Sequence, residues 1–274
     1  MPIINKLFAT YRAKGFEISS GLNPCHMDND AAAPFTCLFK DGVPYTNGLG
    51  IALQEIYFLE CLFDGYQPKK IFLIGNSFGW STIAIGLLNR EAQVVALDSG
   101  GDPKSIEGLE MTNDIGRELG LNVKAVKGIS PTDVEEVVFK ELGGEIDFCF
   151  IDGLHTNEQI VLDHDAVQPF LNEDGVILFH DAISCGMEPG IANIAKKTSG
   201  KIDYLQATSS GMAILHSGTN KQIEATLATF SYDDKLLDTM RQKNRQEKHR
   251  HLYRWKRSLD KRTKALTGLF SSKA

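Results

Sequence analysis

Short apolar runs alternate with longer segments of mixed polarity through the middle of the chain. The apolar runs cover residues 70–74, 94–97, 123–126, 146–151 and 176–179. The segments between them, at 80–89, 106–119, 131–142 and 158–170, have the apolar spacing of helices. Continuous apolar strands separated by helices are typical of a parallel sheet that is covered on both faces. The pattern therefore predicts an α/β fold with a doubly wound, mostly parallel sheet.

The flanking segments have other patterns. Residues 50–63 carry apolar side chains around most of a helix circumference, which predicts a buried helix ending near Asp64 and Gly65. Residues 1–50 have an irregular pattern, with turn signals and little sustained periodicity, which predicts a cover segment. The runs at 202–207 and 211–216 are predicted to pair as an antiparallel edge of the sheet.

Length and composition fit one main domain with additions at both ends. A chain of 274 residues, 42% of them hydrophobic, is long enough to bury a full core. We expect a cover segment and helix at 1–65, the α/β domain at 66–218 and a basic helical extension at 219–274. No stretch approaches the roughly 20 apolar residues of a membrane span, and we expect a cytoplasmic protein. The five cysteines lack disulfide or zinc spacing, which favours reduced thiols.

The charge is distributed unevenly along the chain. Residues 241–264 contain eleven Lys and Arg against two acids, a local charge of +9. Because the net charge of the chain is −6, the remaining residues together carry −15. This basic segment can be drawn as a helix with Leu252, Trp255, Leu259 and Leu266 on one side. One interpretation is contact with an anionic partner: a membrane surface, a nucleic acid or the acidic body of another subunit of a homo-oligomer. The other is a solvated helix that packs through those four residues.

A glycine turn follows the first predicted strand. Gly75, Asn76, Ser77 and Gly79 lead directly into the next predicted helix. Glycine permits a positive φ and close approach of the backbone to a ligand, and a helix N-terminus offers unpaired N–H groups. Ligands of a doubly wound sheet bind at the carboxyl ends of its strands, which is where this turn lies. A tight turn without a ligand has the same residues, so the motif alone leaves both interpretations open.

The second predicted strand ends in an acid, Asp98, which can accept hydrogen bonds from a ribose diol. A turn or N-cap aspartate is the alternative. Ser77 stands where a dinucleotide fingerprint has its middle glycine, so the turn suits the compact methionine of S-adenosylmethionine better than the pyrophosphate of NAD. After the third strand, Gly128 and Ser130 lie where an adenine edge would meet the backbone and a small polar side chain.

Acidic and imidazole side chains follow the fourth and fifth predicted strands. They are Asp152, His155, His180 and Asp181. Because neighbouring parallel strands lie about 4.8 Å apart, Asp152 and Asp181 can share one ligand. Two carboxylates in one cleft repel each other unless a cation or proton lies between them, and oxygen ligands favour Mg²⁺, Mn²⁺ or Ca²⁺. The alternative is that both acids cap helices or bind backbone amides.

The segment DFCFIDGLHTNEQIVLDHDAVQPFLNEDGVILFHDA at 147–182 resembles a block of a class I methyltransferase family that includes antibiotic-pathway and macrolide-sugar O-methyltransferases. There, a strand ending in acid-Gly-x-His precedes a helix with an Asp and a Gly-led strand ending in His-Asp. IGNSFGWST at 74–82 resembles the family's first glycine motif. The resemblance extends over residues 70–182 and implies a Rossmann-like methyltransferase fold.

The resemblance also implies roles for individual residues. Gly75, Asn76, Ser77 and Gly79 would line the S-adenosylmethionine site, and Asp98 would bind its ribose. Asp152 and Asp181 would hold a divalent cation, with His180 as a further ligand. His155 would be the general base, since a neutral imidazole accepts a hydroxyl proton near neutral pH.

Two features depart from the family or lie outside its motifs. Leu73 and Ile74 precede the glycine turn where many methyltransferases have an acid, so recognition of the cofactor's ammonium group must come from elsewhere. Asp163 and Asp165 lie on the intervening helix and are interpreted as structural or solvated.

We expect a metal-assisted O-methyltransferase that acts on a small hydroxylated metabolite, such as a sugar or a catechol-like group. A non-catalytic adenosine-nucleotide-binding module and an NAD-dependent oxidoreductase are the alternatives.

Overall fold

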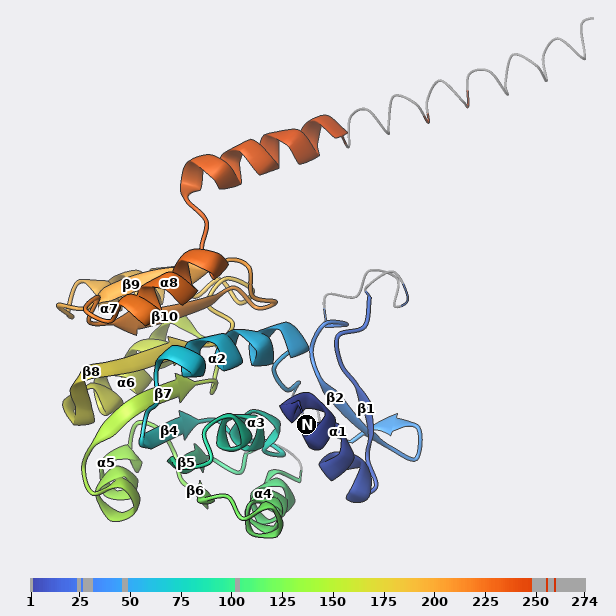
Figure 1. The fold of residues 1–274 in the computed structure, drawn as a ribbon, viewed down its shortest axis with the longest axis vertical. Helices are drawn as coiled ribbons and strands as arrows, with labels where there is room; N and C mark the ends of the chain where they lie inside the picture. Colours follow the sequence, from blue (N-terminus) through green and yellow to red (C-terminus); the bar gives the residue numbers. More distant parts are fainter. Residues whose placement is uncertain are drawn as a thin grey trace, which may run out of the picture. The chain divides into compact units, whose positions relative to one another are not determined.

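A mixed sheet forms the centre of the chain (Figure 1). The computed structural model describes residues 2–23, 26, 32–45, 49–101, 104–247, 255 and 259. Within these residues the sheet has seven strands, in the order β6-β5-β4-β7-β8-β10-β9. They are β4 (Lys70–Ile74), β5 (Gln93–Asp98), β6 (Val123–Lys127), β7 (Ile146–Ile151), β8 (Leu171–Phe179), β9 (Lys201–Leu205) and β10 (Met212–His216). The five predicted parallel strands are confirmed, although β8 begins at Leu171 rather than at Val176.

The strand order reverses beside β4, and this reversal places the binding crevice. β4 pairs in parallel with β5 on one side and with β7 on the other. The chain moves outward from β4 to β6 and then returns to β7. In open α/β sheets, ligands bind outside the carboxyl ends of the strands at such a reversal. The residues that follow Ile74 and Ile151 therefore lie where a ligand is expected.

The last two strands form the antiparallel edge. β10 pairs with β9 along its whole length, which confirms the predicted antiparallel pair. β10 also pairs with β8, through Ala213 and Phe179, so it lies between β8 and β9.

Helices cover both faces of the sheet (Figure 1). They are α2 (Leu53–Gly65), α3 (Trp80–Leu88), α4 (Ser105–Leu119), α5 (Val134–Val137) with a π-helical continuation (Val138–Leu142), α6 (Asn157–Val167) with a 3₁₀ turn (Gln168–Phe170), α7 (Glu188–Ala195) and α8 (Lys221–Phe230). Along β4, Ile71 and Leu73 pack with α2, α3, α4 and α8, whereas Phe72 and Ile74 pack with α5, α6 and α7. Burial on both faces explains the wholly apolar strands and confirms the doubly wound fold.

Helix α1 (Ile3–Ala13) and a small antiparallel sheet lie within the predicted cover segment, where the weak periodicity of the sequence indicated no regular elements. The sheet consists of β1 (Glu17–Ser19), β2 (Cys37–Lys40) and β3 (Val43–Pro44). Leu7 and Tyr11 lie one turn apart on α1 and are both buried. The apolar stripe is too short to stand out from the turn signals around it. Tyr11 donates a hydrogen bond to the backbone oxygen of Phe78 at 2.7 Å, so α1 supports the turn after β4.

The compact unit that contains the sheet ends at Ser231, and a second unit begins at Tyr232. In the second unit, residues 234–247 are helical. Trp255 and Leu259 are helical and exposed, whereas Leu252 and Leu266 lie outside the described residues. The basic helix over residues 241–264 and the domain boundaries at 65/66 and 218/219 stay predictions.

In the part of the chain that the structure describes, no helix is both long and apolar enough to cross a membrane. Cys37, Cys61, Cys149 and Cys185 are free thiols, and Cys25 lies outside the described residues. Burial in β7 raises the pKa of the Cys149 thiol well above its usual value. Cys149 is therefore an unreactive core residue.

Candidate active site

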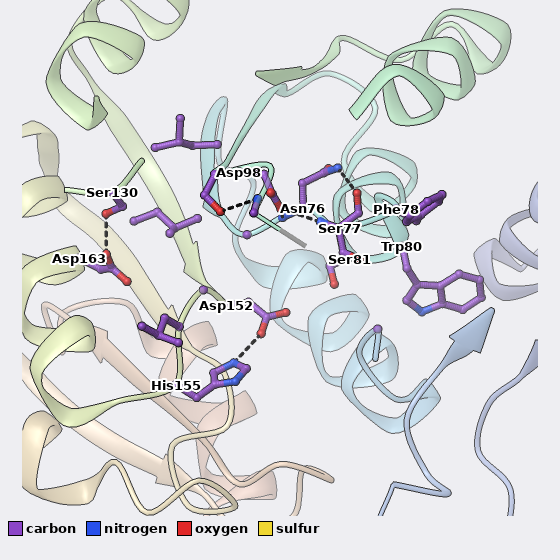
Figure 2. Close-up of a pocket in the computed structure, with 18 of the residues that line it drawn as sticks. Asn76, Ser77, Phe78, Trp80, Ser81, Asp98, Ser130, Asp152, His155 and Asp163 are labelled. Carbon is purple, nitrogen blue, oxygen red and sulfur yellow. Dashed lines mark hydrogen bonds and ion pairs between the residues drawn. The ribbon is translucent and has the colours of Figure 1, made fainter. Parts of the chain in front are cut away.

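A cavity of about 580 Å³ opens at the carboxyl ends of β4, β5, β6 and β7 (Figure 2). Of the residues predicted to bind ligand, it is lined by Gly75, Asn76, Ser77, Asp98, Gly128, Ser130, Asp152 and His155. The cavity has the size of a small-molecule site. Gly79 lies behind this wall, at the N-cap of α3, where its φ is 76°. A Cβ at Gly79 would lie 2.1 Å from Thr112 Oγ1. The absence of a side chain at Gly79 therefore allows α3 and α4 to pack closely.

The glycine turn has an unusual backbone at two positions. Gly75 has a φ of 97°, and a Cβ there would lie 2.0 Å from the backbone oxygen of Asp152. Ser77 has a φ of 47°, which is uncommon for a residue with a side chain. Such conformations persist only where the surroundings fix them, and they concentrate at ligand sites.

The carboxylate of Asp98 fixes this turn. Its Oδ2 accepts the backbone N–H groups of Asn76 at 2.9 Å and Ser77 at 2.8 Å, and its Oδ1 accepts that of Gly100 at 2.8 Å. A carboxylate offers about four acceptor positions. Asp98 therefore holds the turn and keeps one acceptor position, and its binding of a ribose stays a prediction.

Asn76 contributes its backbone to the cavity and its side chain to the protein. The residue is 7% exposed. Its Oδ1 accepts a hydrogen bond from Thr82 at 2.9 Å, and its Nδ2 donates to Thr112 at 3.1 Å. Asn76 thus links the turn to α3 and α4, which was not anticipated when it was predicted as a cofactor residue.

A second polar group forms the wall beyond β6. Ser130 Oγ donates to Asp163 Oδ1 at 2.5 Å, and Gln159 Nε2 donates to the same oxygen at 2.7 Å. Asp163 is 1% exposed, and its burial raises the pKa of the carboxyl group in spite of these hydrogen bonds. Asp163 is thus buried in the cavity wall. Asp165 lies at the surface, where it pairs with Lys197 at 2.7 Å.

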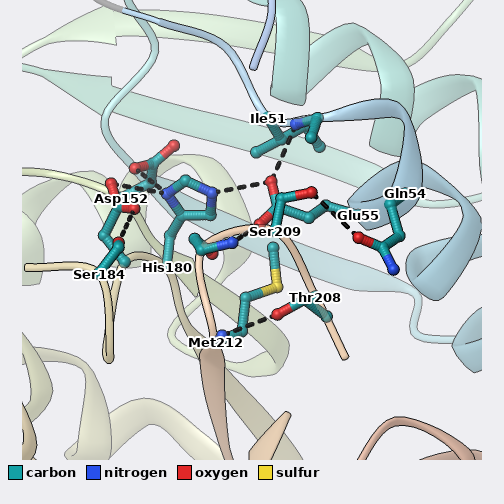
Figure 3. Close-up of polar contacts among 12 residues, drawn as sticks. Ile51, Gln54, Glu55, Asp152, His180, Ser184, Thr208, Ser209 and Met212 are labelled. Carbon is teal, nitrogen blue, oxygen red and sulfur yellow. Dashed lines mark hydrogen bonds and ion pairs between the residues drawn. The ribbon is translucent and has the colours of Figure 1, made fainter. Parts of the chain in front are cut away.

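Beside the cavity, four side chains from the ends of β7 and β8 form what we call the carboxylate–imidazole cluster: Asp152, His155, His180 and Asp181. One nitrogen or oxygen from each lies within 4.8 Å of all the others. His180 Nδ1 is 3.0 Å from Asp152 Oδ1 and 3.2 Å from Asp181 Oδ2 (Figure 3). His155 Nε2 is 3.2 Å and 3.4 Å from the same two oxygens. The structure therefore brings together the four residues predicted from separate strand ends.

The charges in the cluster shift each other's pKa values. Burial alone would raise the pKa of Asp152, but the neighbouring His180 and His155 lower it to about 2. The pKa of Asp181 is also lowered, against its burial, by His180 and Ser184. Burial opposes a charged His180, yet the negative charges of Asp152 and Glu55 hold the pKa of that imidazole well above its ordinary value. The hydrogen bond to Asp152 raises the pKa of His155. The cluster is thus built to hold positive charge.

The donor set fits a divalent cation. His180 Nδ1 is buried and, among the described residues, forms no well-directed hydrogen bond, although two carboxylate oxygens face it. Asp181 has a φ of 53°, a strained conformation at the end of β8. Its Oδ1 accepts a hydrogen bond from Ser184 at 2.5 Å, which leaves Oδ2 facing the imidazoles. Carboxylate oxygens and imidazole nitrogens that converge in this way are suitable ligands for one metal ion.

Glu55 is a functional candidate that the sequence analysis missed. It lies on α2, is 0% exposed, and its Oε2 is 3.1 Å from His180 Nε2 (Figure 3). The sequence pattern shows only a polar residue within a predicted apolar helix. Glu55 does cap α2, since its Oε2 accepts the backbone N–H of Ala52 at 2.9 Å. Its contact with His180 arises only from the tertiary fold.

Comparison with known proteins identifies the domain. Residues 72–182 match the family model described as a methyltransferase domain. This segment contains the glycine turn, Asp98 and the whole carboxylate–imidazole cluster, but it excludes Glu55 and α1. Residues 72–182 therefore carry the methyltransferase domain that the sequence analysis predicts. No curated protein matches the chain by sequence.

Solved structures share the fold at low sequence identity. An O-methyltransferase from Bacillus cereus, solved in complex with SAH, is 17% identical with a TM-score of 0.50, over 61% of this chain and 82% of that one. A methyltransferase from Geobacter sulfurreducens is 15% identical with a TM-score of 0.50, over 61% of this chain and 80% of that one. These likenesses concern the fold, and they confirm the predicted Rossmann-like methyltransferase architecture.

Proposed function

We propose that this methyltransferase transfers the methyl group of S-adenosylmethionine to a hydroxyl oxygen of a small molecule, with the help of a divalent cation. One observation carries the proposal: the carboxylate–imidazole cluster adjoins the cavity that contains the glycine turn. Asp152 belongs to both, because it lines the cavity, faces His180 with its side chain and approaches Gly75 with its backbone.

The cofactor fits the wall formed by β4, β5 and β6. Gly75 and Ser77 would receive its methionine moiety, Asp98 its ribose, and Gly128 and Ser130 its adenine. The SAH held by the structurally similar Bacillus cereus enzyme supports this choice. When bound, S-adenosylmethionine supplies an electrophilic methyl group that needs positioning rather than activation. Ser77 stands in the glycine turn where a dinucleotide fingerprint has its middle glycine, which supports this cofactor over a dinucleotide.

The chain's own residues position the acceptor and take its proton. A divalent cation in the cluster would act as a Lewis acid that lowers the pKa of a bound hydroxyl group. Asp152, Asp181 and His180 would hold the cation. His155 is the exposed member of the cluster, so its imidazole is accessible to an acceptor hydroxyl and serves as the base. Ser184 fixes the carboxylate of Asp181 in place.

The acceptor is a small hydroxylated metabolite, such as a sugar or a catechol-like group. Neighbouring hydroxyl groups can bind one cation together, which explains the need for paired acids. Leu49, Ile129 and Leu154 are exposed apolar residues that line the cavity, and they would cover the apolar face of a ring. An anionic partner for residues 241–264, a homo-oligomer and a cytoplasmic location stay predictions from composition and charge.

Calorimetry with S-adenosylmethionine, S-adenosylhomocysteine and NAD, each with and without Mg²⁺ or Mn²⁺, tests the cofactor. We expect selective binding of the first two at micromolar concentrations. Transfer of labelled methyl from S-adenosylmethionine to a panel of sugars and catechols then tests the reaction. Binding of NAD alone, or of none of the three, would overturn the proposal.

A further inference from the structure

His180 has a buried carboxylate on the side opposite the cluster. Its Nε2 lies 3.1 Å from Glu55 Oε2, and both side chains are almost fully buried, at 4% and 0% exposure. Its Nδ1 faces Asp152 and Asp181. The imidazole therefore lies between three carboxylates, two in the cluster and one on α2.

The hydrogen bonds of Glu55 determine the tautomer of His180, that is, which ring nitrogen carries the proton and which one has the lone pair. Glu55 Oε2 also accepts the backbone N–H of Ala52 at 2.9 Å, and Oε1 accepts that of Ser210 at 2.8 Å. A carboxylate in this environment only accepts hydrogen bonds, so the contact requires a proton on His180 Nε2. In the neutral imidazole, the lone pair then lies on Nδ1 and points into the cluster.

The aromatic rings around His180 fix its plane. The ring of Phe150 lies 5.8 Å from it and the ring of Phe35 lies 6.2 Å from it, both edge to face. With Glu55 holding one nitrogen and two rings restricting rotation, the imidazole has one orientation. A ligand held in this way binds a metal ion without losing side-chain freedom.

We propose that Glu55 is a positioning residue that presents His180 Nδ1 to the cation, and that this imidazole ligand makes the site select a first-row transition-metal ion over Mg²⁺. The inference rests on the divalent cation of the proposed function and adds its chemical class. Imidazole suits zinc, cobalt, nickel and iron, whereas Mg²⁺ and Ca²⁺ prefer oxygen ligands. One of the three proposed ligands, His180, is an imidazole, whereas a site for Mg²⁺ alone is expected to have oxygen ligands only.

The test is titration of the full chain with Co²⁺, followed by its visible absorption bands, and competition with Mg²⁺. We expect Co²⁺ to bind the wild type at least about tenfold more tightly than Mg²⁺. Glu55→Gln keeps the shape of the side chain and removes its charge. It is expected to weaken Co²⁺ binding by about 10-fold to 100-fold, the usual effect of removing an outer carboxylate from a metal-bound histidine.

Asp203→Asn is the matched control, because Asp203 Oδ2 lies 2.9 Å from Nε2 of the buried His216. His216 follows Leu215, which pairs with Ile177, so it lies toward the start of β8 and away from Asp181. This variant removes a carboxylate from another buried imidazole, so it should lower stability without changing the affinity for Co²⁺. Equal losses of affinity in Glu55→Gln and Asp203→Asn would reduce Glu55 to a structural role. His180→Asn, which replaces the ring nitrogen by an amide oxygen, should lower the ratio of Co²⁺ to Mg²⁺ affinity, and it serves if Glu55→Gln does not fold.

Nitrogen NMR of the histidine rings with Zn²⁺, a diamagnetic probe, reads the tautomer directly. We expect His180 with its proton on Nε2 and Nδ1 bound to the metal, and a weakened or lost signal of this form in Glu55→Gln. Wild type that binds Mg²⁺ as tightly as Co²⁺, with no change in His180→Asn, would overturn this inference and leave the proposed function standing. Absence of binding of any divalent ion would overturn both the inference and the cation in the proposed function.

Discussion

The α-carbon of Gly75 approaches Asp152 so closely that a side chain cannot fit between them: an added Cβ would lie 2.0 Å from the backbone oxygen of Asp152. This contact joins the glycine turn to the first residue of the carboxylate–imidazole cluster. The two parts of the site therefore share one backbone contact, and a change at either residue affects both.

Gly75→Ala tests this contact. The new methyl group forces the turn away from Asp152 and replaces glycine at a φ of 97°, so we expect a loss of about 2–4 kcal/mol of stability and at least about tenfold weaker S-adenosylmethionine binding. Thermal denaturation and calorimetry measure the two effects. Gly120→Ala is the control, since Gly120 has a φ of 61° but no atom within 4 Å of an added Cβ. If both variants bound the cofactor equally well, the shared contact would have no functional role.

Asp98→Ala removes the acceptor of three backbone N–H groups in and beside the turn. We expect S-adenosylmethionine to bind at least about 30-fold more weakly, because the turn loses its support and the ribose loses its acceptor. Calorimetry checks this, with the exposed Asp114→Ala as the control. Cofactor affinity that survives in Asp98→Ala would remove the ribose assignment.

Asp181→Ala separates cofactor binding from turnover. Asp181 belongs to the cluster but does not line the cavity wall that would receive the cofactor. We expect unchanged affinity for S-adenosylmethionine within about twofold and a fall in methyl transfer of at least about 100-fold. Asp165→Ala, a surface aspartate on α6, controls for loss of charge. Full turnover in Asp181→Ala would show that the cluster takes no part in the reaction.

Removal of divalent cations should also affect methyl transfer without affecting cofactor binding. Treatment with a chelator is expected to stop methyl transfer and to spare binding of S-adenosylmethionine, because the cofactor wall and the cluster use different side chains. Activity should return on addition of Co²⁺ at lower concentrations than of Mg²⁺. Methyl transfer that proceeds at the full rate in chelator would leave His155 alone as the base.

Tyr11→Phe measures how far α1 supports the turn. The variant deletes the hydroxyl that donates to the backbone oxygen of Phe78 at 2.7 Å and leaves that buried oxygen without this partner. We expect a loss of about 1–2 kcal/mol in the free energy of unfolding, measured by denaturant titration. Tyr57→Phe, at an exposed position on α2, should be nearly neutral. Equal stabilities of the two variants would contradict a supporting role for α1.

The sequence predicts the strands of the sheet, whose apolar pattern is local, and the site residues that directly follow those strands. The central strands β4 and β7 are largely apolar because both faces are buried, and this is visible in single residues such as Phe72 and Leu73, which point to opposite cores. The same reasoning placed Asp152 and Asp181 side by side, since the ends of adjacent parallel strands meet at one edge of the sheet.

What the sequence left out depends on contacts between distant segments. Helix α1 has a short apolar stripe whose meaning becomes clear only when Tyr11 contacts Phe78. Glu55 has an ordinary local explanation as the capping residue of α2, and nothing near it in the chain indicates His180. Asp98 was predicted from its position, but its bonds to the turn follow from the fold.

The contact between Glu55 and His180 also has a consequence for the order in which the chain matures. The two residues are 125 positions apart, so at a synthesis rate of about 5–20 residues per second, Glu55 precedes its partner by roughly 6–25 s. Burying a carboxylate without a partner is strongly unfavourable. We therefore expect helix α2 to stay undocked on the nascent chain until β8 has been added. The core closes later still, because Ser210 and α8 supply further contacts of α2.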